Sequence, residues 1–112
     1  MPNQSVQLGH IFQGLVDPTR RAVLERLSSG PAAVSELARP FKMALPSFSQ
    51  HLNVLENCGL VTSRKSGRVR TYQLAPKSLR LAERWLEKQR TTWEVRLDQL
   101  DTYLVDLKEK QS

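Results

Sequence analysis

The stretch 45–58, LPSFSQHLNVLENC, constrains the fold most, because at helical pitch it divides into two faces. The apolar face, predicted to be buried, comprises Leu45, Phe48, Leu52 and Leu55. The second face comprises Ser47, Gln50, His51 and Val54 and carries no acid, since Glu56 points elsewhere. A helix that enters the DNA major groove needs short hydrogen-bonding side chains and no carboxylate on its outer face. A surface helix with a polar face fits these residues equally well, so the neighbouring segments must decide.

Three shorter helices are predicted upstream, at 5–16, 18–29 and 34–39. Asp17-Pro18 is a strong start signal, an N-cap acid followed by proline at the first helical position. The helix at 34–39 and the two-faced stretch, joined by a tight turn, form a predicted helix-turn-helix over about 34–58. Arg20 and Arg21 oppose the dipole of their helix, and either an anion or solvent would relieve them.

Two strand-like runs follow, at 60–65 and 68–74, joined by a predicted turn at Ser66-Gly67. This hairpin, about 60–74, carries four bases and no acid, and the bases are Arg64, Lys65, Arg68 and Arg70. Such a wing beside a helix-turn-helix can lie along phosphates or enter a minor groove. The alternative is a solvated hairpin whose charges protect its edges from pairing.

The distribution of charge favours a polyanionic partner. Of the net charge of +6, residues 41–75 contribute +4, with five bases against Glu56 alone. No apolar run is long enough to span a membrane, no signal pattern begins the chain, and the single cysteine fits a reducing compartment. We therefore expect a cytoplasmic protein with no membrane partner.

The remainder, about 76–109, reads as one long helix with an apolar residue every seven positions. Thirty residues of helix extend about 45 Å, which is more than a domain of this size covers. We expect the distal stripe and the stripe of the first helix to pair with their copies in a two-fold dimer. The predicted interface comprises Leu8, Ile11, Phe12, Leu15, Trp93, Leu97, Leu100, Tyr103, Leu104 and Leu107.

Four segments, DPTRRAVLERL, VSELARPF, KMALPSFSQHLNVLENCGLV and GRVRTYQL, resemble the ArsR-type winged-helix transcriptional repressors. The resemblance covers roughly residues 8–105, and PF-x-M-x-x-P-x-x-S-x-HL is similar to the branch that lacks metal sites. It implies a homodimer that binds an inverted-repeat operator through paired N- and C-terminal helices. It also implies repression of the protein's own operon and release by an effector.

Metal sensing is not expected. Where metal-sensing relatives carry a Cys-x-Cys pair, this chain has residues 36–39, ELAR. The available ligands, His10, His51 and Cys58, are scattered over three elements and do not form a tetrahedral zinc site. No metal and no cofactor is therefore predicted.

Catalysis is not expected either. Ser49 and His51 lie on different sides of one helix and cannot form a hydrogen-bonded pair. Cys58 at a helix end is predicted to be a buried structural residue, with a redox role left open. Trp85 and Trp93 are predicted to anchor the core or the interface, and an organic effector bound beside them is the alternative.

The sequence therefore predicts a mainly α fold with a small β-hairpin wing (α+β), a single winged helix-turn-helix domain over 1–112. Its predicted function is sequence-specific binding of double-stranded DNA. The alternatives are a winged helix for protein–protein contact and an RNA-binding winged helix. Ser47, Gln50 and His51 are predicted to read base edges, and Ser49 to contact a phosphate or cap a helix. Arg68 and Arg70 are predicted to meet phosphates or the minor groove, supported by Arg64 and Lys65.

Overall fold

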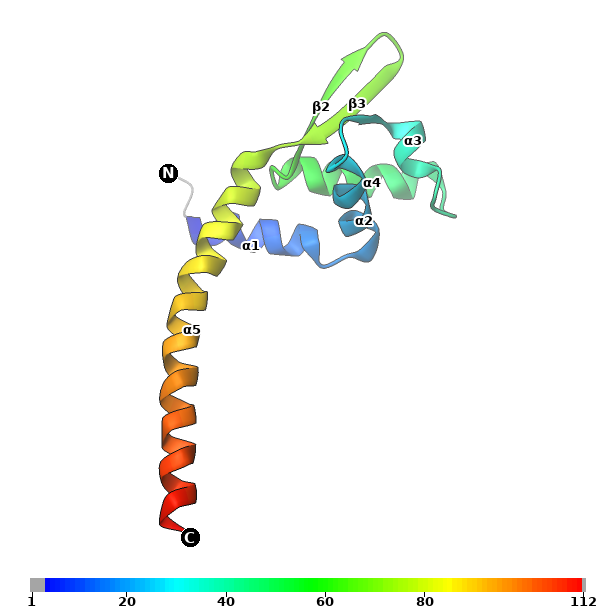
Figure 1. Cartoon of the computed structure of the whole chain (residues 1–112). Helices are drawn as coiled ribbons and strands as arrows, with labels where there is room; N and C mark the ends of the chain where they lie inside the picture. Colours follow the sequence, from blue (N-terminus) through cyan, green and yellow to red (C-terminus); the bar gives the residue numbers. More distant parts are fainter. Residues whose placement is uncertain (1–3, 112) are drawn as a thin grey trace. The chain divides into compact units, whose positions relative to one another are not determined.

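Five helices and three short strands make up the structure, a computed structural model that describes residues 4–111 (Figure 1). The helices are α1 (Gln4–Leu15), α2 (Pro18–Leu27), α3 (Val34–Ala38), α4 (Leu45–Asn57) and α5 (Pro76–Lys110). The strands are β1 (Ala32–Ala33), β2 (Val61–Ser66) and β3 (Val69–Leu74). The predicted class, mainly helical with a small β wing, is confirmed.

Local sequence signals account for the helix boundaries. The carboxylate of Asp17 accepts a hydrogen bond from the backbone N–H of Arg20 at 3.1 Å, and Pro18 occupies the first turn of α2. Pro46 occupies the same place in α4. Gly59 follows the end of α4 with φ of +80°, the left-handed conformation that glycine adopts without strain.

The sheet is antiparallel in the order β1-β3-β2, so β3 is the central strand. Strands β2 and β3 pair from Val61 with Leu74 to Ser66 with Val69 and project from the helices as a hairpin (Figure 1). Its turn lies one residue later than predicted, at Gly67-Arg68, with φ of +62° at Gly67. Strand β1 was not predicted, because two alanines carry no strand signal of their own.

The core lies between the helices and the inner face of the sheet. Its largest fully buried side chains are Phe48, Ile11, Leu37, Leu52, Leu55, Leu60, Val23 and Val61. Two predictions are wrong here. Ile11 has no exposed surface, so it is a core residue of the single chain and offers nothing to a partner. Leu45 is 58% exposed, because the first turn of α4 extends past the core.

The chain divides into two compact units, Met1–Ala82 and Glu83–Ser112, where the sequence predicted one domain. The start of α5 belongs to the first unit, in which Ser78 and Ala82 are buried. The second unit is the rest of α5, whose large apolar side chains are all exposed in the single chain. They are Trp85, Leu86, Trp93, Val95, Leu97, Leu100, Tyr103, Leu104, Val105 and Leu107. Among the helices of residues 4–111, none combines the length and apolar character that crossing a membrane requires.

Candidate nucleic-acid interface

The outer face of α4 presents the polar side chains that the sequence placed there. Ser47 and Gln50 are exposed, whereas Ser49 and His51 are half-buried. Glu56 is directed toward the wing, where its Oε2 accepts a hydrogen bond from Ser63 Oγ at 2.6 Å. The outer face therefore keeps short hydrogen-bonding groups and no carboxylate, as major-groove recognition requires.

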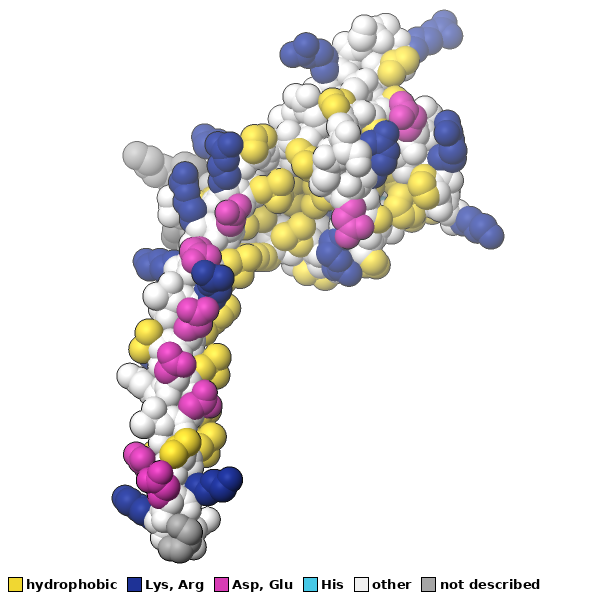
Figure 2. Space-filling view, in the orientation of Figure 1, with side chains coloured by type: hydrophobic (Ala, Val, Ile, Leu, Met, Phe, Trp, Pro, Cys, Tyr) yellow, Lys and Arg dark blue, Asp and Glu magenta, His cyan; other side chains and the backbone are white. Residues whose placement is uncertain are grey.

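The four basic side chains of the wing are all exposed, and Figure 2 shows basic side chains on both sides of the far end of the hairpin. Lys65 and Arg70 are directly opposite each other on β2 and β3, so they share one face of the hairpin. Arg64 lies on the other face, because neighbouring residues of a strand point to opposite sides. Like charges in opposite positions destabilise a hairpin, and a polyanion beside them removes that cost.

Arg70 is already engaged by the protein. Its Nη1 donates to Ser63 Oγ at 2.8 Å, and Ser63 in turn donates to Glu56, so this chain of hydrogen bonds joins the wing to the recognition helix α4. Within residues 4–111, the side chains of Arg64, Lys65 and Arg68 make no hydrogen bond and no ion pair. No other side chain in the described part of the chain holds these three in place, so they can neutralise a partner's charge.

A shallow groove of about 320 Å³ lies where the wing meets the helix-turn-helix. Leu45 lines it together with Val69, and both are more than half exposed. Arg68 and Arg70 also line the groove, so apolar and cationic groups stand side by side. Apolar side chains beside arginines suit the thymine methyl group and the adjacent phosphates. The helical pattern missed this feature because it placed Leu45 in the core.

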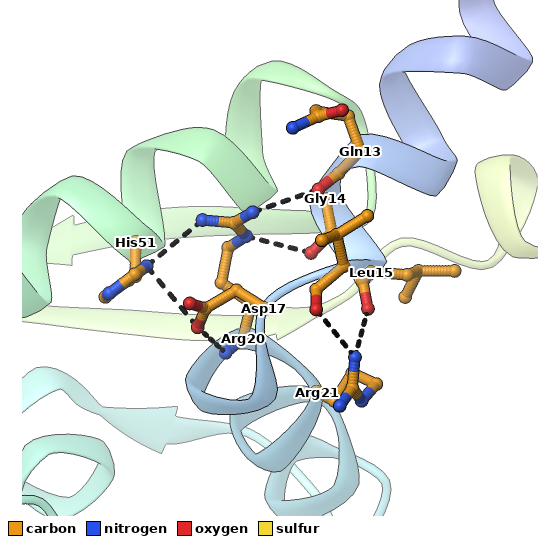
Figure 3. Close-up of polar contacts among 8 residues, drawn as sticks. Gln13, Gly14, Leu15, Asp17, Arg20, Arg21 and His51 are labelled. Carbon is orange, nitrogen blue, oxygen red and sulfur yellow. Dashed lines mark hydrogen bonds and ion pairs between the residues drawn. The ribbon is translucent and has the colours of Figure 1, made fainter.

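His51 points toward the start of α2 rather than straight outward (Figure 3). Its Nδ1 lies 3.1 Å from Arg20 Nη1 and 3.8 Å from Asp17 Oδ2, and its side chain is 24% exposed. Arg20 also donates to the carbonyl oxygens of Gly14 and Gln13, at 2.8 and 2.9 Å. Neither the Arg20 contact with His51 nor its contacts with α1 were predicted, since only a phosphate or solvent was expected there.

The carboxyl group of Asp17 is electrostatically tuned by these neighbours. Burial by itself raises the pKa of Asp17. The hydrogen bond from the backbone N–H of Arg20, the charge that His51 carries when it is protonated in acid, the N–H of Thr19 and the charge of Arg20 together outweigh burial, so this pKa is lowered. Asp17 therefore stays ionised and keeps its role as the N-cap of α2.

Cys58 is buried, and a side chain added at Gly14 would meet its Sγ at 2.9 Å. Burial raises the pKa of the Cys58 thiol, which leaves it protonated and weakly nucleophilic. This arrangement agrees with the predicted structural role. No cluster of His, Cys, Asp or Glu within residues 4–111 has the arrangement to hold a metal ion.

The predicted interface residues fall into two groups, apart from Ile11. Leu8, Phe12 and Leu15 of α1 are partly buried against the core and keep some exposed surface. The α5 residues from Trp93 to Leu107 are exposed along the second unit. Their role in a dimer stays a prediction, supported by the apolar surface that they expose.

Comparisons with known proteins agree with this geometry. The model of the arsR family of bacterial regulatory proteins matches residues 17–63, from the N-cap of α2 into β2. An HTH-type transcriptional regulator of Mycobacterium tuberculosis is 52% identical over 68 residues, which are 61% of this chain and 64% of that protein. The match thus spans just under two thirds of that relative.

Solved structures extend the likeness to most of the chain. The crystal structure of an ArsR family transcriptional regulator is 53% identical in sequence, with a TM-score of 0.78. The likeness covers 84% of this chain and 97% of that regulator's chain. The solution structure of a homodimeric winged helix-turn-helix DNA-binding domain from Mycobacterium bovis is 27% identical, with a TM-score of 0.58. That likeness covers 81% of this chain and 80% of the M. bovis domain.

Proposed function

The chain belongs to the ArsR family of bacterial regulatory proteins, which are transcriptional regulators and not enzymes, and from this membership we propose how it acts. It binds double-stranded DNA as a homodimer, recognises an inverted-repeat operator, and represses transcription of its own operon by occupying the promoter. It works in the cytoplasm, where a bacterial chromosome lies. An organic effector, bound near the aromatic side chains of α5, would release it.

The observation that carries this proposal is the pairing of Lys65 with Arg70 at the end of an acid-free wing. Two cations held in opposite positions on a hairpin cost stability, and a polyanionic phosphate backbone turns that cost into affinity. The adjacent helix α4 presents Ser47 and Gln50 to solvent with no carboxylate between them. The two opposed cations of the wing by themselves would fit any polyanion. Together with the acid-free polar face of α4, they fit double-stranded DNA, whose major groove exposes base edges.

The two elements take different roles in the proposal. Ser47, Gln50 and His51 of α4 read base edges, and Gln50 is suited to adenine. Arg64, Lys65, Arg68 and Arg70 of the wing contact phosphates or enter the minor groove, and Ser49 contacts a phosphate. Phosphate contacts set the position of the protein and base contacts set its specificity.

The homodimer is supported by the exposed apolar surface of α5. Trp93, Leu100 and Leu107 recur every seven residues, and Leu97 and Leu104 fill the positions between them, which is the repeat of a helix-pairing seam. A two-fold dimer presents two copies of α4, and two identical reading heads related by a two-fold axis match an inverted repeat.

Fluorescence anisotropy of the protein on a duplex from its own upstream region tests the proposal. We expect cognate binding that resists random duplex, with an affinity that falls steeply between about 50 and 200 mM salt. Equal affinity for cognate and random duplex would contradict operator recognition. Preference for RNA in competition, or affinity insensitive to salt, would instead favour the RNA-binding or protein-binding alternative.

Two variants separate base reading from phosphate contact. Gln50→Ala should lose affinity for cognate duplex only, because it removes a base contact. Arg68→Ala should weaken binding to every sequence and lower the salt slope by about one. Equal losses on cognate and random duplex for both variants would contradict the division of roles.

A further inference from the structure

Arg20 joins three parts of the first unit through a single guanidinium (Figure 3). Its Nε and Nη2 donate to the carbonyl oxygens of Gly14 and Gln13, at the C-terminal end of α1. Its Nη1 reaches His51 Nδ1 on α4 at 3.1 Å. A guanidinium is planar and rigid, so the two bonds to α1 fix the direction in which the third N–H points. Arg20 thus extends from α2 as a bracket between α1 and the recognition helix.

The chemistry of this contact points to one tautomer of His51. Arginine has five N–H donors and no acceptor, so Nδ1 of His51 must accept the hydrogen bond. A neutral imidazole that accepts at Nδ1 carries its hydrogen on Nε2. The carboxylate of Asp17 is the other charged group facing the ring, and at 3.8 Å it lies beyond hydrogen-bonding distance of Nδ1. Figure 3 shows the second ring nitrogen pointing away from Asp17 and Arg20.

We propose that Arg20 is a positioning residue for DNA recognition, which holds His51 as the neutral Nε2–H tautomer and so presents a hydrogen-bond donor on the recognition helix. The acceptors that such a donor suits are those of base edges in the major groove, such as guanine N7 and O6 or thymine O4. The inference rests on the proposed operator binding. Arg20 lies on α2, outside the helix-turn-helix, and would determine whether His51 acts as a hydrogen-bond donor toward DNA.

The same contacts couple α1 to the reading face. Because the side chain of Arg20 is anchored on the last turn of α1, a displacement of that turn moves the guanidinium away from His51. The ring is then free to exchange tautomers or to turn toward Asp17. The reading state of His51 therefore depends on the two bonds that Arg20 makes with α1.

Arg21 provides a matched control. It is the neighbouring arginine and it also caps α1, with Nη1 donating to the carbonyl oxygens of Leu15 and Val16 at 2.7 and 2.8 Å. In the structure of residues 4–111 its side chain makes no hydrogen bond to α4. A lysine in place of either arginine keeps the charge and loses the fork of donors. Only Arg20→Lys should disturb His51.

The first test reads the tautomer directly, on the full-length protein without DNA. Two-bond 1H–15N correlation spectra separate the Nε2–H tautomer, the Nδ1–H tautomer and the imidazolium, and His10→Gln assigns the only other histidine. We expect the Nε2–H pattern for His51 in the wild type and in Arg21→Lys, and a mixture in Arg20→Lys. An Nδ1–H or imidazolium pattern in the wild type at neutral pH overturns the proposal, whether or not Arg20→Lys folds.

The second test measures the ratio of cognate to random affinity by anisotropy, with thermal unfolding followed in parallel. Arg20→Lys should lower the ratio about tenfold, the scale of one base contact, and Arg21→Lys should leave it unchanged. His51→Gln carries an amide donor that needs no arginine to orient it, so adding Arg20→Lys to it should cost no further specificity. An equal loss in the His51→Gln background overturns the positioning role.

The two tests distinguish failure of the proposed function from failure of the contact between Arg20 and His51. If the wild type shows no cognate preference, the proposed function fails and the recognition role of Arg20 is overturned with it. The tautomer spectra decide the contact between Arg20 and His51 in either case, because they require no DNA.

Discussion

At the scale of single residues, Leu45 and Leu52 show that helical periodicity predicts the face of a helix on which a residue lies, but not whether that residue is buried. Both belong to the apolar arc of α4, yet Leu52 is buried and Leu45 is 58% exposed. Leu52→Ala should lower the free energy of unfolding by about 2–5 kcal/mol, because it leaves a cavity. Leu45→Ala should change it by less than about 0.5 kcal/mol. Urea unfolding of both variants measures the difference, and equal losses would place Leu45 in the core after all.

The cap of α2 gives a second residue-scale prediction, with a defined pH dependence. The pKa of Asp17 is lowered in the folded protein, so its stabilising effect is complete above the unfolded pKa of about 3.9 and disappears as the pH falls through the folded pKa. Asp17→Ala should therefore cost about 1 kcal/mol at pH 7 and progressively less in acid. Asn is a good N-cap without the charge, so Asp17→Asn should retain most of the stability at pH 7. A cost for Asp17→Ala that stays constant down to pH 3 would contradict this account.

At the scale of elements, the cations of the wing lower the folding stability of the hairpin and raise its affinity for DNA. Removing one of the two opposed cations with Lys65→Gln should leave folding stability unchanged or slightly higher, because repulsion from Arg70 is relieved. The same change should weaken binding to every duplex and lower the salt slope by about one. Lys77→Gln, an exposed lysine on α5, is the matched control and should change neither. Stability lost together with affinity would mean that Lys65 supports the hairpin itself.

Elements were predictable from sequence where a local signal defines them. Asp17-Pro18 and Gly59 mark their helix ends through their own hydrogen bonding and backbone freedom, and both were placed correctly. Strand β1 is two alanines that become a strand only by pairing with Tyr72 and Thr71 of β3, a partner far along the chain. The contact between Arg20 and His51 spans 31 residues and likewise has no local signature. Sequence reasoning found the reading face of α4 and missed what holds one of its side chains in place.

For the molecule as a whole, the exposed apolar side chains of the distal half of α5 are the feature that a single chain leaves unexplained. The winged-helix unit buries its own core, whereas the large apolar side chains of residues 83–111, the described part of the second unit, are all exposed. The predicted dimer seam contains Leu97 and Leu104, and Thr91 and Thr102 lie on the opposite side of the same helix. Two substitutions in the seam can therefore be compared with two on the opposite side of the helix. The comparison distinguishes the effect of losing the seam from the effect of changing the helix in general.

The double variant Leu97→Gln/Leu104→Gln should dissociate the dimer, because it exchanges buried apolar surface for amides. Sedimentation velocity should show monomers at concentrations where the wild type is dimeric. Operator affinity should fall by more than about tenfold, since one reading head then binds alone.

Glutamine is a good helix former and adds no charge, so Thr91→Gln/Thr102→Gln should remain dimeric and bind as the wild type does. If the seam variant stays dimeric and keeps its affinity, the two copies must associate through α1 and other surfaces. The spacing of two reading heads on an inverted repeat would then have to be set without the distal half of α5.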